Sequence, residues 1–357
     1  MADADESKTL EAKCFCGSVH LSFDMPVSSL PLSVYLCHCS LCRYSTGAPC
    51  IVHAQFPVGL LPKHLGESGE GKMTSYTSEG AGCSYVFCST CGCHIGAVSL
   101  GRDQWTMATS IFADHGPENF RITLHVFSKS AKGGGISSVL TRMGDGEMKS
   151  WDPPDDDPSA KVVEAEAEVG EDGEDRLRSQ CKCGGVSFAV RRPTQTVLDD
   201  GFMSKLVSPR DRKKWRALYD TCNDCRLTTG THVVGWATVP LALCEPKIDA
   251  TLRIGTAKTY SSSEGVLRSF CGVCGATVFY SSASRQPSEE QAVVDVATGI
   301  LRAPEGPMAE DWLTWRERPA FAASGIRYDK HFSEALDEGM RNWTKARYGN
   351  ELNMEVG

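Results

Sequence analysis

The chain has 357 residues, of which 41% are apolar and 23% charged, a length that suits about two domains. Its 37 basic and 45 acidic residues give a formal net charge of −8, so we expect no nucleic-acid partner. No apolar run approaches the ~18 residues of a membrane span, and the acidic start MADADESKTLEAKC is unlike a signal peptide. These features predict a soluble, cytoplasmic protein that does not associate with membranes.

Short β-rich runs, broken by glycine, proline and serine, make up most of the chain. Their alternation and composition predict strands at 19–23, 104–110, 186–190 and 292–298. Helices are expected at 208–218, with Pro209 at the first helical position, and at 333–348, with Ser333 as the cap. The chain is therefore predicted to be mainly β.

Cysteine is unusually frequent, with 17 copies in the chain. Disulfides are disfavoured in a reducing cytosol, and an odd number of cysteines does not fit a fully paired disulfide framework. We therefore expect the cysteines to bind metal or to take part in catalysis.

Three cysteine motifs occur twice in the same order, which predicts two homologous domains. They are C-x-C-G at 14–17 and 181–184, C-x-x-C-R at 39–43 and 222–226, and F-C-x-x-C-G at 87–92 and 270–275. A weaker echo pairs residues 148–151 with residues 340–343. We place the first domain at 1–151 and the second at 179–357.

Residues 152–178 separate the two predicted domains and hold eleven acidic and three basic residues. Such a segment buries too little apolar surface to offset the entropy of ordering it, so we expect a flexible acidic linker. An acidic arm that docks on a basic protein partner is the alternative.

Each predicted domain offers four thiols that suit one structural zinc ion. A C-x-x-C turn faces two sulfurs toward one ion, and the upstream C-x-C supplies two more, which completes the tetrahedral set that zinc prefers. The predicted ligands are Cys14, Cys16, Cys88 and Cys91 in the first domain and Cys181, Cys183, Cys271 and Cys274 in the second.

The middle cluster of the first domain consists of Cys37, Cys39 and Cys42 and is one ligand short of a closed tetrahedron. Three protein ligands with an open fourth position are typical of a catalytic zinc, which polarises a carbonyl or holds a thiol as its anion. We therefore predict that these residues are catalytic as well as metal-binding. Closure by a fourth protein ligand, or a cluster without metal, are the alternatives. The candidate fourth ligands are His38, Cys50, Cys83 and Cys93.

In the second domain the corresponding residues are Asp220, Cys222 and Cys225. A carboxylate can ligate zinc beside two thiolates, so these residues form a second candidate catalytic metal site. A degenerate remnant without metal is the equal alternative.

The order C-x-C-G, C-H-C-x-x-C-R with a following Thr-Gly, and F-C-x-x-C-G resembles the glutathione-dependent formaldehyde-activating enzyme family, to which centromere protein V is also similar. The resemblance covers each predicted domain nearly end to end. It implies two tandem Mss4-like (β-tent) domains, with a structural zinc on each four-cysteine set. It also implies a second, reactive zinc on Cys37, Cys39 and Cys42.

The resemblance further implies carbon–sulfur lyase chemistry, because family members are known for making S-hydroxymethylglutathione from formaldehyde and glutathione. We therefore predict a zinc-dependent enzyme that acts on a glutathione-type thiol adduct or on a carbonyl substrate, with glutathione as a possible cosubstrate. A tailoring enzyme that dehydrates, isomerises or cleaves a carbonyl compound is the second hypothesis. A non-catalytic, zinc-stabilised interaction module is the third.

Two features of the second domain bear on substrate binding. The arginine that the family carries two residues before F-C is present as Arg268, but Tyr85 replaces it in the first domain. Arg268 can hold a substrate or glutathione carboxylate as a bidentate partner, or it can pin a loop. An inserted basic stretch is either a solvated helix face or a clamp for an anionic substrate. Its residues are Arg210, Arg212, Lys213, Lys214 and Arg216.

Overall fold

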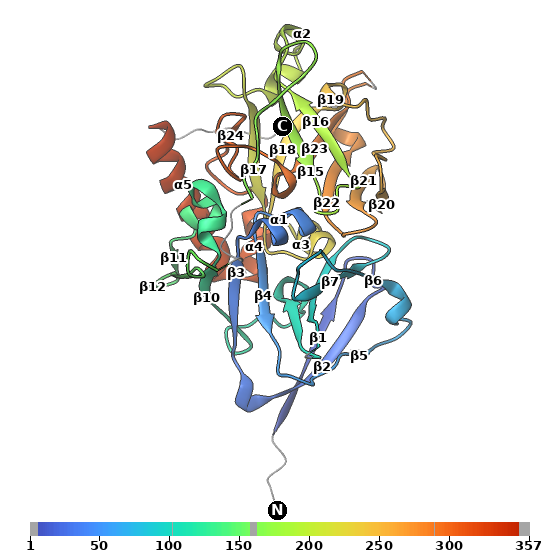
Figure 1. Ribbon diagram of the computed structural model, residues 1–357, viewed down its shortest axis with the longest axis vertical. Helices are drawn as coiled ribbons and strands as arrows, with labels where there is room; N and C mark the ends of the chain where they lie inside the picture. Colours follow the sequence, from blue (N-terminus) through green and yellow to red (C-terminus); the bar gives the residue numbers. More distant parts are fainter. Residues whose placement is uncertain (1–5, 102, 158–162, 289, 350–357) are drawn as a thin grey trace, which may run out of the picture.

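The computed structural model describes residues 6–101, 103–157, 163–288 and 290–349 (Figure 1). These residues form five β-sheets with short helices at their edges, which confirms the predicted mainly β class. We call residues 6–151 the first half and residues 163–349 the second half. No helix in these described ranges has the length and apolar character needed to cross a membrane.

The first half contains a large sheet and a small one. The large sheet has the strand order β13 (Lys149–Trp151), β10 (Phe120–Val126), β3 (Leu32–Cys37), β4 (Ile51–Gln55), β9 (Trp105–Ala108), β8 (His94–Ser99), β7 (Cys83–Cys88) and β6 (Met73–Tyr76). The small sheet consists of β1 (Ser7–Lys13), β2 (His20–Pro26) and β5 (Lys63–His64), and a separate pair joins β11 (Arg142–Met143) to β12 (Gly146–Glu147). Strand β3 runs parallel to β10 and antiparallel to β4.

The second half has the same arrangement. Its large sheet has the order β20 (Ala257–Ser263), β21 (Val266–Cys271), β22 (Thr277–Ser282), β23 (Val293–Ala297), β18 (Val234–Pro240), β17 (Trp215–Asp220) and β24 (Leu313–Trp315). Its small sheet has the order β14 (Glu168–Val169), β15 (Asp175–Gln180), β16 (Ser187–Arg191) and β19 (Cys244–Glu245). Strands β20, β21, β22, β23 and β24 occupy the sheet positions that β6, β7, β8, β9 and β10 occupy in the first half. Strand β17 runs parallel to β24.

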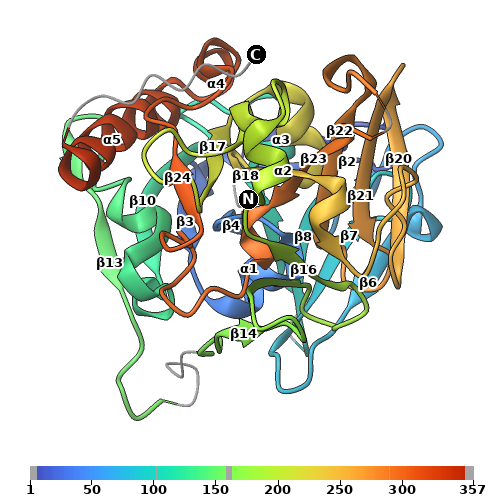
Figure 2. The same ribbon diagram turned by 90° about the horizontal axis from the view of Figure 1, so that it is seen from above.

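The helices are short except for the last. They are α1 (Ser40–Thr46), α2 (Gln195–Asp199), α3 (Asn223–Thr229), α4 (Ala322–Tyr328) and α5 (Lys330–Tyr348). The 3₁₀ turns are η1 (Val27–Ser29), η2 (Glu70–Lys72), η3 (Thr109–Ile111), η4 (Ser128–Ser130), η5 (Lys132–Ser138), η7 (Met203–Leu206), η8 (Leu241–Leu243), η9 (Ala283–Arg285) and η10 (Thr298–Ile300). Figures 1 and 2 both show α5 beside the edge of the first half that carries β10, so the C-terminal helix spans the two halves.

The predicted strands and the C-terminal helix are confirmed, with shifted ends. The four strand segments lie in β2, β9, β16 and β23. Helix α5 begins three residues before the expected cap because the side chain of Asp329 accepts a hydrogen bond from the backbone N–H of Phe332. Leu336, Met340 and Trp343 are buried on one face of this helix, as the sequence period indicated.

The helix expected at 208–218 is wrong. Residues 215–220 form β17, which pairs with β18 and β24. The reason is a period of two, because Trp215, Ala217 and Tyr219 are buried on one face while the residues between them point to the other. Ser208 caps a turn, accepting hydrogen bonds from the backbone of residues 210 and 211.

The predicted flexible linker also differs from the structure, in part. Glu168 and Val169 pair with β15, and Arg178 forms an ion pair with Glu168. Acidic side chains in this stretch face arginines, which offsets their mutual repulsion and lets the segment join the sheet. Residues 158–162 lie outside the described residues. The weak echo between 148–151 and 340–343 has no structural counterpart, because the first segment is largely strand β13 and the second is helix.

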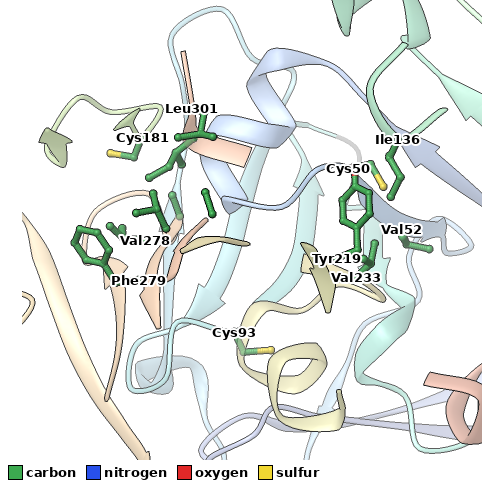
Figure 3. Close-up of a cluster of buried hydrophobic side chains, with 14 of the residues drawn as sticks. Cys50, Val52, Cys93, Ile136, Cys181, Tyr219, Val233, Val278, Phe279 and Leu301 are labelled. Atoms are coloured by element: carbon green, nitrogen blue, oxygen red, sulfur yellow. The ribbon is translucent and has the colours of Figure 1, made fainter. Parts of the chain in front are cut away.

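The two halves meet across α1 and α3 through reciprocal contacts. The backbone N–H of Lys182 donates to the carbonyl of Tyr44, and in mirror fashion that of Phe15 donates to the carbonyl of Leu227. A single buried apolar cluster continues from one half into the other. Figure 3 shows Cys50, Val52 and Ile136 of the first half close to Tyr219 and Val233 of the second. The halves therefore share one core.

Two glycines let the halves approach this closely. Gly47 and Gly230 end α1 and α3 in the left-handed conformation, with φ of 76° and 72°. A Cβ on Gly47 would lie 2.2 Å from the carbonyl oxygen of Thr277, and one on Gly230 would lie 2.0 Å from that of His94. Both positions accordingly require glycine for backbone conformation and for contact between the halves.

The substitution Gly230→Ala is expected to destabilise the protein clearly more than Gly59→Ala. Both glycines have a left-handed φ, which costs an alanine about 1 kcal/mol, but a Cβ on Gly59 meets nothing within 4 Å. Overpacking at Gly230 adds about 1–3 kcal/mol. Urea unfolding of both variants measures the difference, and equal losses would contradict the close packing of α3 on the first half.

Candidate metal centres

The first four-cysteine set is assembled from two distant turns. Cys14 and Cys16 lie between β1 and β2, whereas Cys88 ends β7 and Cys91 lies in the turn that follows. Their four sulfur atoms lie within 4.8 Å of one another, with 3.5 Å between Cys14 and Cys16 and 3.6 Å between Cys16 and Cys88. Sulfurs at about 2.3 Å from a tetrahedral zinc ion are separated by about 3.8 Å. The set therefore suits zinc in number, donor type and spacing.

The second four-cysteine set repeats this arrangement with Cys181, Cys183, Cys271 and Cys274. The sulfurs of Cys181 and Cys183 are 3.5 Å apart, as are those of Cys183 and Cys271. The hydrogen bond with Cys181 lowers the pKa of Cys183 to about 7. Backbone N–H groups of residues 185 and 186 point at the sulfurs, which favours thiolates, the form that binds metal.

The predicted three-cysteine cluster is brought together where β3 passes into α1. Cys37 ends the strand, Cys39 is the N-cap of the helix, and Cys42 lies in its first turn. The Cys39 sulfur accepts a hydrogen bond from the Cys42 backbone N–H, and the sulfurs of Cys37 and Cys42 are 3.5 Å apart. Cys37 and Cys42 are buried and Cys39 is partly exposed. Cys39, at the start of the helix, is therefore the most accessible residue of the three.

Among the described residues, no further histidine, cysteine or carboxylate joins this cluster within 4.8 Å. The candidate fourth ligands are engaged elsewhere or lie farther away. His38 Nε2 is hydrogen bonded to His125 Nδ1 at 2.8 Å, and Cys50 and Cys93 are buried in the shared core (Figure 3). Cys83 packs beside the cluster without entering it.

Tyr85 stands next to the cluster, in the position that corresponds to Arg268 in the second half. Its hydroxyl lies 3.0 Å from the sulfur of Cys42. Burial, together with the neighbouring thiols, raises the pKa of Tyr85 well above its ordinary value, so the hydroxyl keeps its proton near a negatively charged sulfur. Two buried histidines lie beyond Tyr85. His94 packs against Tyr85 and stacks on His53, with the two imidazole ring centres 5.1 Å apart.

The second half holds Asp220, Cys222 and Cys225 in the matching place, at the end of β17 and the start of α3. One carboxylate oxygen of Asp220 accepts from the Cys222 backbone N–H at 2.7 Å, and the other lies 3.5 Å from the Cys225 sulfur. Burial raises the pKa of Asp220. The aspartate thus supplies a carboxylate oxygen where the first half supplies a thiol.

Arg268 contacts this second cluster directly. Its Nη1 donates to the Cys225 sulfur at 3.5 Å, and its Nε donates to Ser262 at 3.1 Å. Burial lowers the pKa of Arg268, but the charges of Cys225, Cys222 and Tyr280 and the hydrogen bond to Cys225 together outweigh it, so the pKa is raised. In both halves, therefore, the side chain two residues before F-C contacts the last cysteine of the three-residue cluster.

A cavity of about 660 Å³ opens on the same sheet face as the second cluster. Alternate residues of β17 share a face, so Arg216 and Leu218, which line the cavity, point to the side of Asp220. Leu218 and Cys222 both pack against the buried group that contains Cys225. The basic lining residues are Lys205, Arg216, Arg285 and Arg316. Arg216, which belongs to the basic insertion in the sequence, is one of these lining residues. The sequence motifs did not point to Lys205, Arg285 or Arg316.

Comparison with known families supports the sequence interpretation. Residues 9–130 match the model of the family described as "Glutathione-dependent formaldehyde-activating enzyme". The matched range contains the first four-cysteine set, the three-cysteine cluster and Tyr85, and the predicted resemblance is confirmed over this range. No curated protein matches the chain.

Proposed function

We propose that the chain is a zinc-dependent enzyme that makes or breaks a carbon–sulfur bond between a small thiol of glutathione type and a carbonyl compound. The observation that carries this proposal is the three-cysteine cluster Cys37, Cys39 and Cys42, whose three sulfurs lie within 4.8 Å of one another with no fourth ligand among the described residues. Three protein ligands are typical of catalytic rather than structural zinc. The family matched over 9–130 is named for formaldehyde and glutathione, which supports formaldehyde as the carbonyl compound and glutathione as the thiol to test first.

The proposed reaction is an addition and its reversal. The thiol sulfur forms a bond to the carbonyl carbon, the carbonyl π bond opens, and the thiol proton ends on the oxygen, so that no oxidant or further reactant is needed. A zinc ion on the cluster would supply a Lewis acid for the carbonyl and a partner for the thiolate. Tyr85, with its hydroxyl 3.0 Å from Cys42, keeps its proton and would donate a hydrogen bond to an oxygen anion formed at the cluster.

Cobalt spectroscopy on the full chain tests whether the cluster accepts an external thiol. With cobalt in place of zinc, added glutathione is expected to strengthen the sulfur-to-cobalt charge-transfer band, because a fourth thiolate joins the three-cysteine cluster while the four-cysteine sets are already complete. The zinc-loaded chain is then expected to accelerate exchange between ¹³C-formaldehyde and its glutathione adduct. An unchanged cobalt spectrum would instead support a non-catalytic, metal-stabilised interaction module.

The cavity of the second half favours a second candidate function, a tailoring enzyme for a larger anionic carbonyl compound. A volume of about 660 Å³ exceeds the needs of formaldehyde, and the apolar and cationic lining suits an amphipathic anion. Asp220, Cys222 and Cys225 would be the reactive cluster beside it. The same cavity also suits the glutathione part of a bulky thiol adduct.

The substitution Arg316→Ala is expected to weaken binding of an S-alkylglutathione probe about tenfold, because a charge-assisted hydrogen bond contributes about 1.5–3 kcal/mol. Arg316 lines the cavity, whereas the exposed Arg318 nearby does not. Titration calorimetry compares the two variants, with Arg318→Ala as the matched control. Equal affinities would show that the anion binds outside this cavity.

A further inference from the structure

A third type of side-chain cluster lies where the two halves meet and contains no cysteine. It consists of His115 in the loop between η3 and β10, His232 in the loop between α3 and β18, and Asp329 between α4 and α5. The first residue belongs to the first half and the other two to the second. Figure 1 shows α3 and α4 near this junction.

The three side chains converge within metal-binding distance. The Nε2 atoms of His115 and His232 are 3.2 Å apart, and Oδ2 of Asp329 lies 3.5 Å from His232 Nε2 and 3.6 Å from His115 Nδ1. Nitrogen and oxygen ligands at about 2.0–2.2 Å from a tetrahedral ion are about 3.3–3.6 Å apart. One ligand atom from each residue can therefore surround a single ion with small side-chain adjustments.

Hydrogen bonding within the protein leaves this cluster incompletely satisfied. The side chains of His115 and His232 are 4% and 1% exposed, and the Nδ1 atom of each has no hydrogen-bond partner among the described residues. A neutral histidine pair that shares one proton between its Nε2 atoms must place its second N–H on one of these Nδ1 atoms. Two imidazole nitrogens that face each other at 3.2 Å need a proton or a cation between them, and a metal ion in this place also meets the Asp329 carboxylate.

The surroundings hold these side chains in place. Phe120 stacks on His115 at 5.2 Å, and Tyr328 and Phe332 pack against His232. Asp329 uses Oδ1 to cap α5, which leaves Oδ2 facing the imidazoles. Arg226, the neighbouring cation, donates to the Ser110 carbonyl and lies over the Tyr328 ring, and it forms no ion pair with Asp329 within the described part of the chain.

We propose that His115, His232 and Asp329 bind one divalent transition-metal ion, with zinc as the first choice, in a site shared by both halves. Two imidazoles and one carboxylate form a ligand set that suits zinc and other first-row metals. The site lies outside the cysteine chemistry and goes beyond the proposed function. Its ion links the junction loop of the first half to the start of α5, and so it stabilises the association of the halves.

This cluster is not part of either repeated motif. His232 lies two residues after the Gly of the shared Thr-Gly, and the first half has Pro49 at that distance. Asp329 lies in the C-terminal extension that follows β24. The site consequently needs segments of both halves, and its two histidines are 117 residues apart in the sequence.

Metal content of the full-length protein tests this site. After purification in zinc, the substitution Asp329→Asn is expected to lower the zinc content by one ion per chain while leaving the fold intact, because asparagine also caps helices well. His232→Gln should lose the same ion. The substitution His331→Gln, at an exposed position in the first turn of α5 and outside the cluster, is the matched control and should keep the full content.

Cobalt distinguishes this ion from the cysteine-bound ions. Relative to the parent protein, Asp329→Asn loaded with cobalt should lose weak ligand-field absorption and keep the whole sulfur-to-cobalt charge-transfer band. Equal metal content and equal spectra for the parent, Asp329→Asn and His232→Gln would overturn the proposal and leave a hydrogen-bonded cluster without metal. A loss of the charge-transfer band in Asp329→Asn would also count against it, since the lost ion would then be bound by thiolates.

Discussion

Replacing Cys91 with serine should leave the chain without a stably folded first half. The four-cysteine set joins the turn after β1 to the turn after β7, and structural zinc contributes about 10–16 kcal/mol of binding free energy in zinc-finger peptides. A whole domain is stable by only about 5–15 kcal/mol. The loss of one thiolate can therefore remove the whole net stability of the first half. Circular dichroism and thermal unfolding would measure the loss of fold, and zinc content would measure the loss of the ion.

Cys93 provides the matched control, two residues further along the same turn. Its side chain is fully buried in the shared core and does not belong to the four-cysteine set. Cys93→Ala should cost about 1 kcal/mol, as expected for a small buried side chain, and should keep all zinc. A Cys91→Ser variant that retains its zinc and its unfolding temperature would contradict the structural role of this set.

The substitution Cys39→Ser should abolish turnover while the fold survives. Zinc contributes several kcal/mol of transition-state stabilisation in its catalytic sites, so removal of one of three thiolate ligands should lower the rate about 100-fold or more. The structure explains why the fold tolerates the change. Cys39 is partly exposed and caps α1 through its sulfur, and serine is among the preferred N-cap residues.

The corresponding change in the second half, Cys222→Ser, shows which cluster is active. Cys222 is likewise partly exposed and caps α3, so the two variants are matched in local structure. Loss of activity only in Cys39→Ser places the reaction in the first half, and loss only in Cys222→Ser places it beside the cavity. Undiminished turnover in both variants would rule out the three-residue clusters as the reactive sites.

The cysteine ligand sets were predictable because their geometry is largely local. A C-x-C or C-x-x-C spacing places two sulfurs on one turn whatever the rest of the fold does, and the repetition of three motifs indicated which pairs belong together. The strands in β2 and β16 and the buried face of α5 were predictable for a similar reason, since their periods of 2 and 3.6 are visible in a short window.

The segment 208–220 shows where local signals failed. Pro209 and the following basic residues suggested a helix start, yet Trp215 to Asp220 form strand β17 of the large sheet. The alternate residues Trp215, Ala217 and Tyr219 are buried, and this burial outweighs the local preference for a helix. The acidic stretch at 168–178 is a second segment where local signals failed. The pairing of Glu168 and Val169 with β15 and the ion pair between Arg178 and Glu168 cannot be inferred from its composition.

By itself the sequence determined the mainly β class, the repeated cysteine motifs and the ligand types at each cluster, because these depend on residue spacing within one turn or one strand. Only the tertiary structure decided that the three-cysteine cluster gains no fourth ligand from the described residues and that Tyr85 lies beside Cys42. The tertiary structure likewise decided that a cationic cavity opens on the sheet face that carries Asp220 and that His115, His232 and Asp329 meet. Each of these depends on contacts between segments far apart in the chain, whose geometry is set by packing of the shared core rather than by neighbouring residues.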